Sequence, residues 1–163
     1  MRFEELEKRH YPLLARHYAE AYNAPPWNDE WTVERAAEKI DLLMDSRGAF
    51  GLVCYADDGN DADDASDADY DDERGGAFAG AVLGRHDIYY NCRQFYVDEL
   101  FVPPALQGRG IGTMLLAELE RRLAAMGVGK VLLITSKGEH TEDFYKKRGF
   151  NTYSGMVLMG KRL

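Results

Sequence analysis

A short glycine-rich segment is the part of the chain best suited to binding a phosphate. Residues 107–112 read Gln-Gly-Arg-Gly-Ile-Gly and stand between a strand-like run and a helix-like run. Such a turn presents free backbone N–H groups at the positive end of the helix dipole, and glycine lets a phosphate or pyrophosphate approach them closely. The alternative is a tight turn that binds nothing. It is less favoured because three glycines and Arg109 fall within six residues.

The residues on either side predict a strand leading into a helix. Residues 94–102 are rich in aromatic and β-branched side chains and are followed by two prolines, which is typical of a strand end. Over residues 110–126, apolar side chains recur at helical spacing with charged residues between them. These apolar residues are Met114, Leu115, Leu119, Leu123 and Met126.

The common nucleotide-binding patterns do not describe this loop. It lacks the Gly-Lys-Ser/Thr ending of a P-loop. Its glycines also miss the Gly-x-Gly-x-x-Gly spacing, because Thr113 occupies the third glycine position. The sequence therefore predicts a phosphate-binding loop of another kind.

The chain resembles the GNAT family of N-acetyltransferases in two ordered motifs. The family signature Gln/Arg-x-x-Gly-x-Gly/Ala follows a strand and begins a helix, and Gln107, Gly110 and Gly112 fill those places. A second family segment, Phe-Tyr-x-x-x-Gly-Phe, matches residues 144–150, with a predicted strand at 130–135 between the two motifs. Two motifs in the right order are more specific than either alone.

The resemblance implies an α+β protein with the GNAT acyl-CoA N-acyltransferase fold, in which helices flank a mixed, mostly antiparallel sheet in an α/β/α arrangement. With 163 residues and 45% hydrophobic content, we expect one N-acetyltransferase domain over residues 1–163. Expected helices are 4–22, 33–45 (with Thr32 as N-cap), 110–126 and 140–148. Expected strands are 49–55, 77–89, 94–102, 130–135, 150–154 and 156–162, with residues 1–3 as a further candidate.

The resemblance also implies acetyl-CoA as co-substrate, because the family moves its acetyl group to an amine by direct attack in a ternary complex. It places the pantetheine arm beside residues 100–102 like an added strand, with the N–H near Leu100 facing the thioester oxygen. The pyrophosphate would rest on backbone N–H groups of residues 108–113. The implied acetyl-CoA residues are Leu100, Phe101, Val102, Gln107, Gly108, Arg109, Gly110, Ile111, Gly112, Thr113 and Phe144.

Tyr145 matches the position of the family's general acid. A phenol has a pKa of about 10, so it stays protonated at neutral pH and can donate to a departing thiolate. From the residues alone, a core aromatic on an amphipathic helix beside Phe144 is an equally good interpretation. The motif match favours catalysis.

Asp98 and Glu99 are the candidate general bases. A carboxylate in a strand of Tyr, Val, Leu and Phe residues is costly to bury unless it is functional or paired. Regular alternation predicts that the two side chains face opposite sides, with Val97, Glu99 and Phe101 on one face, which favours Glu99. Family members use either position or a water chain. The equally weighted alternative is a carboxylate held by backbone N–H groups or by an arginine.

The acceptor amine is expected against the connector between the first two helices. Trp27 and Trp31 stand there among acidic residues and predict an aromatic, anionic wall suited to a cationic amine. The alternative is that they only pack the connector onto the core. Tyr89 and Tyr90, in the turn before the central strand, are further substrate-binding candidates. The expected acceptor is a small-molecule amine such as an aminoglycoside or polyamine, with a protein or peptide amine as the alternative.

The net charge of −8 is concentrated in one segment. Residues 57–73 hold ten acidic residues and no basic one, so the rest of the chain has 18 of the 28 acids against 20 bases. The stretch 57–74 is predicted to be a disordered, solvated hairpin loop, because it has little apolar surface to bury. Its acids lack the spacing of a calcium loop. A second hypothesis is that they attract cationic substrates electrostatically.

Composition sets the remaining expectations. Cys54 and Cys92 have neither metal-like spacing nor an activating neighbour, so we expect no metal, no thiol nucleophile and a reducing, cytoplasmic setting. The absence of a long apolar run or a basic patch argues against membrane and nucleic-acid partners. Two other classes stay open: an acetyl-CoA-binding regulatory module without catalysis, and an interaction protein whose C-terminal strands pair in a homodimer.

Overall fold

The computed structural model describes residues 1–57, 76–138 and 140–163 of the chain. The chain divides into two compact units, Met1–Leu133 and Ile134–Leu163. The acidic segment predicted at 57–74 lies outside the described residues, apart from the backbone of Asp57 at the end of a strand. Its predicted disorder and electrostatic role therefore stay predictions.

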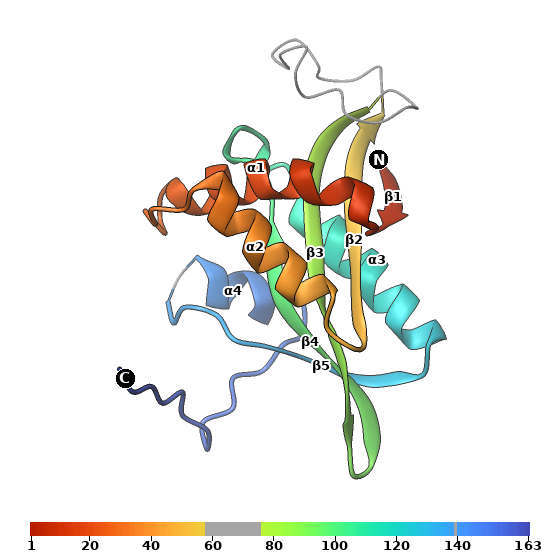
Figure 1. The fold of residues 1–163 in the computed structure, drawn as a ribbon. Helices are drawn as coiled ribbons and strands as arrows, with labels where there is room; N and C mark the ends of the chain where they lie inside the picture. The colour runs from red at the N-terminus through yellow and green to blue at the C-terminus, as the bar shows by residue number, and fades with distance from the viewer. Residues whose placement is uncertain (58–75, 139) are drawn as a thin grey trace. The chain divides into compact units, whose positions relative to one another are not determined.

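Within the described part of the first unit, five strands form one mixed sheet in the order β1-β2-β3-β4-β5 (Figure 1). Strands β1 to β4 pair antiparallel with one another, and β5 pairs parallel with β4. The predicted α+β class with a mixed, mostly antiparallel sheet is confirmed. The strands are β1 (Arg2–Glu5), β2 (Ala49–Asp57), β3 (Gly76–Tyr89), β4 (Cys92–Phe101) and β5 (Val128–Leu133).

Helices cover both faces of this sheet (Figure 1). α1 and α2 pack against each other over one face, and α3 lies on the opposite face. Among the described residues, no helix has the length and apolar content needed to cross a membrane. The helical segments of the first unit are η1 (Lys8–His10), α1 (Tyr11–Asn23), α2 (Val33–Met44), η2 (Pro104–Leu106) and α3 (Ile111–Ala125).

The N-terminus differs from the prediction. Residues 2–5 form β1 on the edge of β2, so the candidate strand at the start of the chain is confirmed. The helix predicted over residues 4–22 was wrong in its first part, because α1 begins only at Tyr11. Pro12 occupies the first turn of α1, where a missing N–H costs no hydrogen bond. The residues before it gain more from pairing with a strand edge than from extending the helix.

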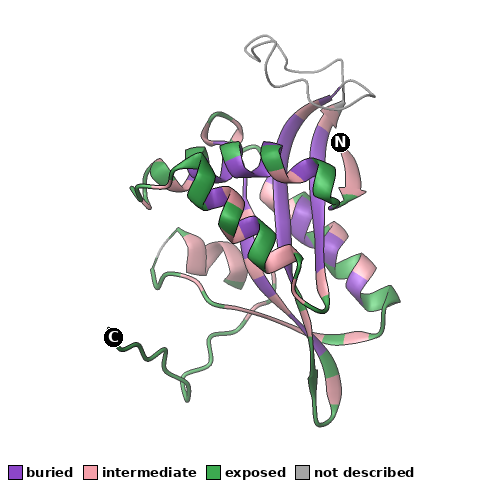
Figure 2. Ribbon diagram, in the orientation of Figure 1, coloured by how far each residue is buried: buried purple, intermediate pink, exposed green. Residues whose placement is uncertain are grey.

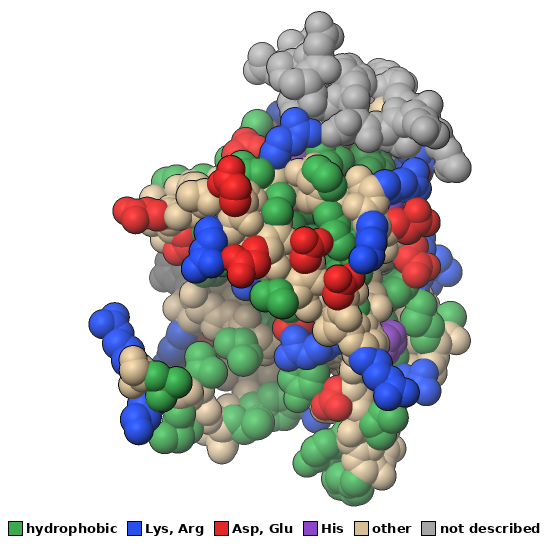
Figure 3. Space-filling model, viewed as in Figure 1, with side chains coloured by type: hydrophobic (Ala, Val, Ile, Leu, Met, Phe, Trp, Pro, Cys, Tyr) green, Lys and Arg blue, Asp and Glu red, His purple; other side chains and the backbone are tan. Residues whose placement is uncertain are grey.

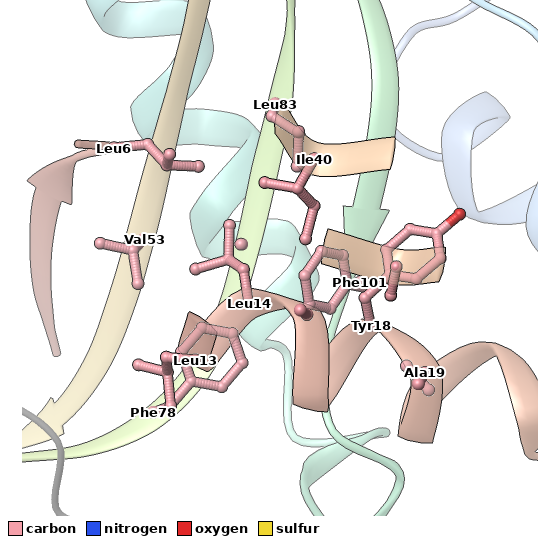
Figure 4. Packing of buried hydrophobic residues seen from close by; sticks show 14 of the residues in the cluster. Leu6, Leu13, Leu14, Tyr18, Ala19, Ile40, Val53, Phe78, Leu83 and Phe101 are labelled. Atoms are coloured by element: carbon pink, nitrogen blue, oxygen red, sulfur yellow. The ribbon is translucent and has the colours of Figure 1, made fainter. Parts of the chain in front are cut away.

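An apolar core fills the space between α1, α2 and the sheet (Figure 4). Tyr18 of α1 packs edge-on against Phe101 of β4, with ring centroids 5.5 Å apart. Leu14 and Ile40, one from each helix, are fully buried over the sheet. The central strands are buried, whereas the outer faces of the helices are exposed (Figure 2). This core holds α1 and α2 over the end of β4.

The apolar periodicity predicted for residues 110–126 is confirmed on the face of α3 that packs on the sheet. Leu115, Leu119 and Leu123 are buried against the sheet, whereas Met114 and Met126 at the edges of the stripe are exposed. The predicted N-cap of α2 is confirmed as well. The hydroxyl of Thr32 accepts a hydrogen bond from the N–H of Arg35.

A β-bulge interrupts the pairing of β3 and β4 at Asp98. Leu83 lies opposite Glu99, but the next residue, Gly84, lies opposite Val97. Asp98 is therefore an extra residue on β4. Such an insertion breaks the regular alternation of side chains along the strand.

The bulge overturns two expectations about the strand acids. Glu99 lies two residues from Phe101 and shares its face towards α1 and α2, whereas Val97, before the bulge, faces the other side. The carboxylate of Asp98 binds Arg85, which alternation along β3 places on the α1/α2 face as well. The predictions that the two acids face opposite sides, and that Val97 shares the face of Glu99, were therefore wrong. Regular alternation does not hold across a bulge.

The parallel ladder between β4 and β5 covers only the first part of β4. It runs from Arg93 opposite Val128 to Val97 opposite Leu133, where the described pairing ends. The strand predicted at 130–135 is thus present but shifted towards the N-terminus. Beyond this point, the edge of β4 that faces away from β3 has backbone groups available to an extended ligand.

The second unit contains α4 (Thr141–Lys146), which confirms the middle of the helix predicted at 140–148. The strands predicted at 150–154 and 156–162 were wrong. Residues 151–163 are all exposed and none is in a strand. A strand forms only where a neighbouring strand accepts its hydrogen bonds, so β-propensity alone is insufficient.

We predict that Gly84→Ala destabilises the protein by about 1–3 kcal/mol or more, the usual range for overpacking. A Cβ at this position would lie 1.9 Å from the backbone oxygen of Tyr96, so the strands would have to move apart at the bulge. Denaturant unfolding measures the change. Gly129→Ala is the matched control, because its Cβ would lie 3.5 Å from the nearest atom, an ordinary contact. Equal losses in the two variants would contradict this account of the bulge.

Candidate functional site

Residues 107–113 form the entry to α3 and adopt the conformations of a tight loop. Gly108 and Gly110 have φ values of 78° and 83°. Residues that carry a Cβ rarely adopt this left-handed backbone conformation, so both positions favour glycine. The Nε2 group of Gln107 donates to the carbonyl oxygen of Val102 at 3.1 Å. This bond ties the loop to the end of β4.

The loop leaves room for a ligand beside its N–H groups. Residues 107–110 are exposed, and a Cβ built on Gly108 or Gly110 would meet no other described residue within 4 Å beyond its chain neighbours. The N–H groups of Thr113 and Met114 donate to the carbonyl of Gly110. The N–H groups before them lie at the helix start, where helix geometry provides no acceptor. Open space, free donors and the helix dipole together suit a phosphate or pyrophosphate.

The other residues predicted to bind acetyl-CoA in the first unit differ in how far they are buried. Ile111, Phe101 and Val102 are buried and fix the loop and the strand end to the core. Leu100, Gly112 and Thr113 are half-buried, and Arg109 is exposed beside the loop, where it adds a positive charge.

The carboxylate of Glu99 is buried and has a different partner on each oxygen. The hydroxyl of Tyr22 donates to Oε2 at 2.6 Å, and the ammonium of Lys39 lies 2.7 Å from Oε1. Only 9% of Glu99 is exposed. The two partners supply the hydrogen bond and the positive charge that a buried carboxylate needs.

Two tyrosines one helical turn apart bring phenol groups to this carboxylate. The ring centroids of Tyr18 and Tyr22 lie 4.4 Å apart on α1. Burial raises the pKa of Tyr18, and the neighbouring Glu99 carboxylate raises it further. Tyr18 therefore stays protonated throughout the physiological range.

The ammonium of Lys39 lies between the carboxylate and two aromatic rings. It is 5.5 Å from the ring centroid of Trp31 and 5.8 Å from that of Tyr18. The Lys39 side chain is 34% exposed, so water partly screens its ion pair with Glu99. We call Tyr18, Tyr22, Trp31, Lys39 and Glu99 the Glu99 cluster.

Asp98 has a different environment. The guanidinium of Arg85 lies 2.5 Å from its Oδ1 and 5.8 Å from the ring centroid of Tyr96. The Oδ2 atom of Asp98 is buried and has no hydrogen-bond partner among the described residues. An arginine thus holds Asp98, as one of the sequence-based alternatives proposed, and one carboxylate oxygen remains an available acceptor.

Of the two connector tryptophans, Trp31 belongs to the Glu99 cluster and Trp27 lies beside it. The ring of Trp27 lies 5.8 Å from that of Tyr22, and the ring of Trp31 meets that of Tyr18 edge-on at 5.1 Å. The side chain of Asn23 makes two hydrogen bonds with the backbone of Trp31. The tryptophans therefore pack the connector onto α1, and the ring of Trp31 also faces the ammonium of Lys39.

Tyr89 and Tyr90 lie away from this cluster, at the tip of the β3–β4 hairpin. They are 52% and 88% exposed, and their ring centroids are 4.9 Å apart. Tyr89 is six residues along β3 from Leu83, the partner of Glu99. At about 3.3 Å per strand residue, the separation is about 20 Å. The structure does not bring them together with the other predicted acceptor residues.

Tyr145 and Phe144 lie on α4 in the second unit. Both are half-buried, and the ring of Tyr145 meets those of Phe144 and Phe150 edge-on, with centroids 5.0 and 5.5 Å away. The guanidinium of Arg148 lies over the Phe144 ring, 3.6 Å from its centroid. The roles of Tyr145 as acid and of Phe144 in binding acetyl-CoA stay predictions.

Sequence reasoning missed four residues of the site: Tyr18, Tyr22, Lys39 and Arg85. Lys39 looks like a surface lysine of an amphipathic helix, and Arg85 looks like a charged residue near a strand end. Tyr22 had a usable signal: it follows Tyr18 by four residues, so both rings lie on one helix face next to the tryptophan connector.

The site and the fold agree with the family that the sequence itself matches. The sequence pattern of the Acetyltransferase (GNAT) family aligns with residues 14–150. This range covers the Glu99 cluster, the glycine-rich loop and Tyr145, the predicted acid. The chain belongs to the acetyltransferase (GNAT) family.

Similar proteins support this assignment. An acetyltransferase of Sodalis glossinidius is 29% identical over 92 residues, which are 56% of this chain and 62% of that protein, so the match spans less than two thirds of the relative. A crystal structure of a probable acetyltransferase superposes with a TM-score of 0.74 at 12% identity, covering 100% of this chain and 98% of the other. An aminoglycoside acetyltransferase from an uncultured soil metagenomic sample, in complex with sisomicin, has a TM-score of 0.68 at 15% identity over 99% of this chain and 95% of that one.

We predict that Gly110→Ala costs about 1–2 kcal/mol of stability through backbone strain alone, since L residues avoid this left-handed region. Because the added Cβ would have no atom of another described segment within 4 Å, we expect no steric part in this cost. Gly155→Ala is the control: its site is equally open and its φ is not positive, so its stability should barely change. Denaturant unfolding of both variants tests the point, and an unchanged Gly110→Ala would show that the loop is not held in this conformation.

Proposed function

We propose that the protein is an acetyl-CoA-dependent N-acetyltransferase that acts on a small cationic primary amine by direct attack in a ternary complex. The observation that carries the proposal is the Glu99 cluster. In it the ammonium of Lys39 lies between a buried carboxylate and aromatic rings, so these surroundings suit a cationic amine. The family to which the chain belongs uses acetyl-CoA as co-substrate. Amine binding and acetyl donation are the two requirements of this reaction.

The loop at residues 107–113 supplies the binding of acetyl-CoA in this proposal. The N–H groups at the start of α3 and the open surface beside Gly108 and Gly110 suit the pyrophosphate, and Arg109 adds charge. The unpaired end of β4 offers backbone groups to the pantetheine arm, with the N–H near Leu100 turned to the thioester oxygen. A hydrogen bond there stabilises the negative charge that develops on this oxygen during attack.

Glu99 is the base that we propose for the amine. Its carboxylate lies on the face of α1 and α2, where the acceptor connector also lies, and Oε1 already contacts an ammonium. The hydroxyl of Tyr22 fixes the other oxygen, so the carboxylate is oriented before the substrate arrives. Asp98 is the second candidate, because its Oδ2 remains without a partner while Arg85 holds Oδ1. Tyr145 is the proposed acid for the departing thiolate.

A cationic acceptor fits the charge of the surrounding helices. Residues 11–45, which comprise α1, the connector and α2, hold seven acidic and three basic residues, a formal charge of −4. Acidic side chains gather over α1 and α2 on the face seen in Figure 3. A negative surface attracts polyamines and aminoglycosides, and the rings of Trp27 and Trp31 add cation–π attraction.

We expect free thiol release from acetyl-CoA to depend on a cationic amine in a panel of polyamines, aminoglycosides, amino acids and peptide N-termini. The kcat/KM should rise with pH along a limb that reports the base. Glu99→Gln should abolish that limb and lower kcat by about 100-fold or more, the contribution typical of a general base. Asp98→Asn should keep the limb, and neither variant should weaken acetyl-CoA binding.

The outcomes separate the parts of the proposal. Loss of the limb in Asp98→Asn and its retention in Glu99→Gln would move the role of base to Asp98. Tight binding of acetyl-CoA without release for any amine would favour the non-catalytic regulatory module. Release with peptides alone would replace the small-molecule acceptor by a protein or peptide amine.

A further inference from the structure

The proposed reaction assigns no chemical step to Lys39, yet its side chain lies where the acceptor amine is expected to bind. The ammonium lies 2.7 Å from the Oε1 atom of Glu99, and its side chain is 34% exposed. The rings of Trp31 and Tyr18 lie within 5.5 and 5.8 Å of it. A carboxylate on one side and aromatic faces on the other are the surroundings that a cationic acceptor amine requires.

Lys39 is chemically the same kind of group as the proposed acceptor. It is a primary ammonium at the end of a flexible chain, in contact with the carboxylate that we propose as base. Glu99 is also adjacent in sequence to Leu100, whose N–H is proposed to face the thioester oxygen. The amine of Lys39 therefore contacts the side chain of the residue that precedes the proposed thioester-binding N–H.

We propose that Lys39 is itself an acetylation site, modified by the same active site when acetyl-CoA is bound and no acceptor amine is present. The inference rests on the proposed function, because it uses the same base and the same acetyl donor. It adds a modification site, formed within one molecule, to the intermolecular transfer.

The step balances in atoms and charge. Glu99 accepts one proton from the Lys39 ammonium, and the resulting Nζ lone pair attacks the thioester carbonyl of acetyl-CoA. The Nζ–C bond forms, the C–S bond breaks, and the second nitrogen proton goes to the departing thiolate. The products are acetyl-lysine and the free thiol of CoA, with one proton released to solvent from Glu99.

Acetylation would change the site that performs it. The amide of acetyl-lysine carries no charge, so Glu99 would lose its ion pair and the rings of Trp31 and Tyr18 would lose their cation. Glu99 would then keep its contacts with the phenols of Tyr22 and Tyr18 but no cationic partner of those described for its carboxylate. The acetyl group would also occupy space beside the carboxylate, where an acceptor amine must bind.

Exposure distinguishes this reaction from random chemical acetylation. Lys39 is half-buried and ion-paired, whereas Lys161 is exposed near the C-terminus. Uncatalysed transfer from acetyl-CoA in solution favours the accessible amine, so it should modify Lys161 before Lys39. Transfer within the active site should give the opposite order. Lys161 is therefore an internal reference for chemical reactivity.

The test incubates the full-length protein with acetyl-CoA and no amine, and follows acetyl occupancy at each lysine by peptide mapping with a protease that does not cleave at lysine. We expect Lys39 to be acetylated at least about tenfold faster than Lys161, a modest part of what a general base contributes. In denaturant the preference should vanish. Lys39→Arg, which keeps a cation beside Glu99, should show no acetylation at this position and an unchanged rate at Lys161.

Glu99→Gln is the decisive variant, because it should remove the preference for Lys39 in a protein that still binds acetyl-CoA. Acetylation of Lys39 no faster than Lys161, or a preference that survives in Glu99→Gln, would overturn the inference. The amine panel, run on the same preparation, separates the two proposals. Amine-dependent thiol release with an unmodified Lys39 would refute only the inference, whereas no transfer to any amine and no binding of acetyl-CoA would refute the proposed function as well.

Discussion

At Gly84 the third and fourth strands approach so closely that a Cβ would lie 1.9 Å from the backbone oxygen of Tyr96. The sheet accommodates this contact with one extra residue, Asp98, on β4. Without it, regular alternation would turn Glu99 towards the face under α3, away from Tyr22 and Lys39. The extra residue therefore determines that the carboxylate of Glu99 contacts α1 and α2. The candidate site depends on this one irregularity in an otherwise regular ladder.

The position of Glu99 also explains the unusual composition of the neighbouring helices. A buried carboxylate is unfavourable unless charge and hydrogen bonds compensate for the lost water. Here Lys39 and Tyr22 supply both, and the raised pKa of Tyr18, caused first by burial and then by the Glu99 carboxylate, keeps that phenol a donor. The same groups that stabilise the folded protein thus prepare a carboxylate for an ammonium ligand. In this account stability and function use one set of contacts, with aromatic residues from α1 and the connector and a lysine from α2.

The sequence predicts those features that depend on local pattern. The glycine loop, the apolar stripe of α3 and the N-cap at Thr32 follow from spacing and residue type, and the order of two motifs indicates the family. Features that depend on tertiary contacts do not follow. β1 replaces the start of a predicted helix because a strand edge is available, and the bulge at Asp98 depends on an approach between two strands. Lys39 enters the site only because α2 packs over β4. A glycine inside a strand, such as Gly84, is a local signal that is compatible with a bulge.

The central claim is that the loop before α3 holds acetyl-CoA while Glu99, turned by the bulge, receives the acceptor amine. A crystal structure of the protein with CoA and an acceptor amine tests it most directly. The account predicts pyrophosphate oxygens within hydrogen-bond distance of the N–H groups of residues 108–113. It also predicts the amine nitrogen against the carboxylate of Glu99, with the Lys39 ammonium displaced from Oε1. An amine bound away from Glu99, or a pyrophosphate that does not touch the loop, would contradict the account.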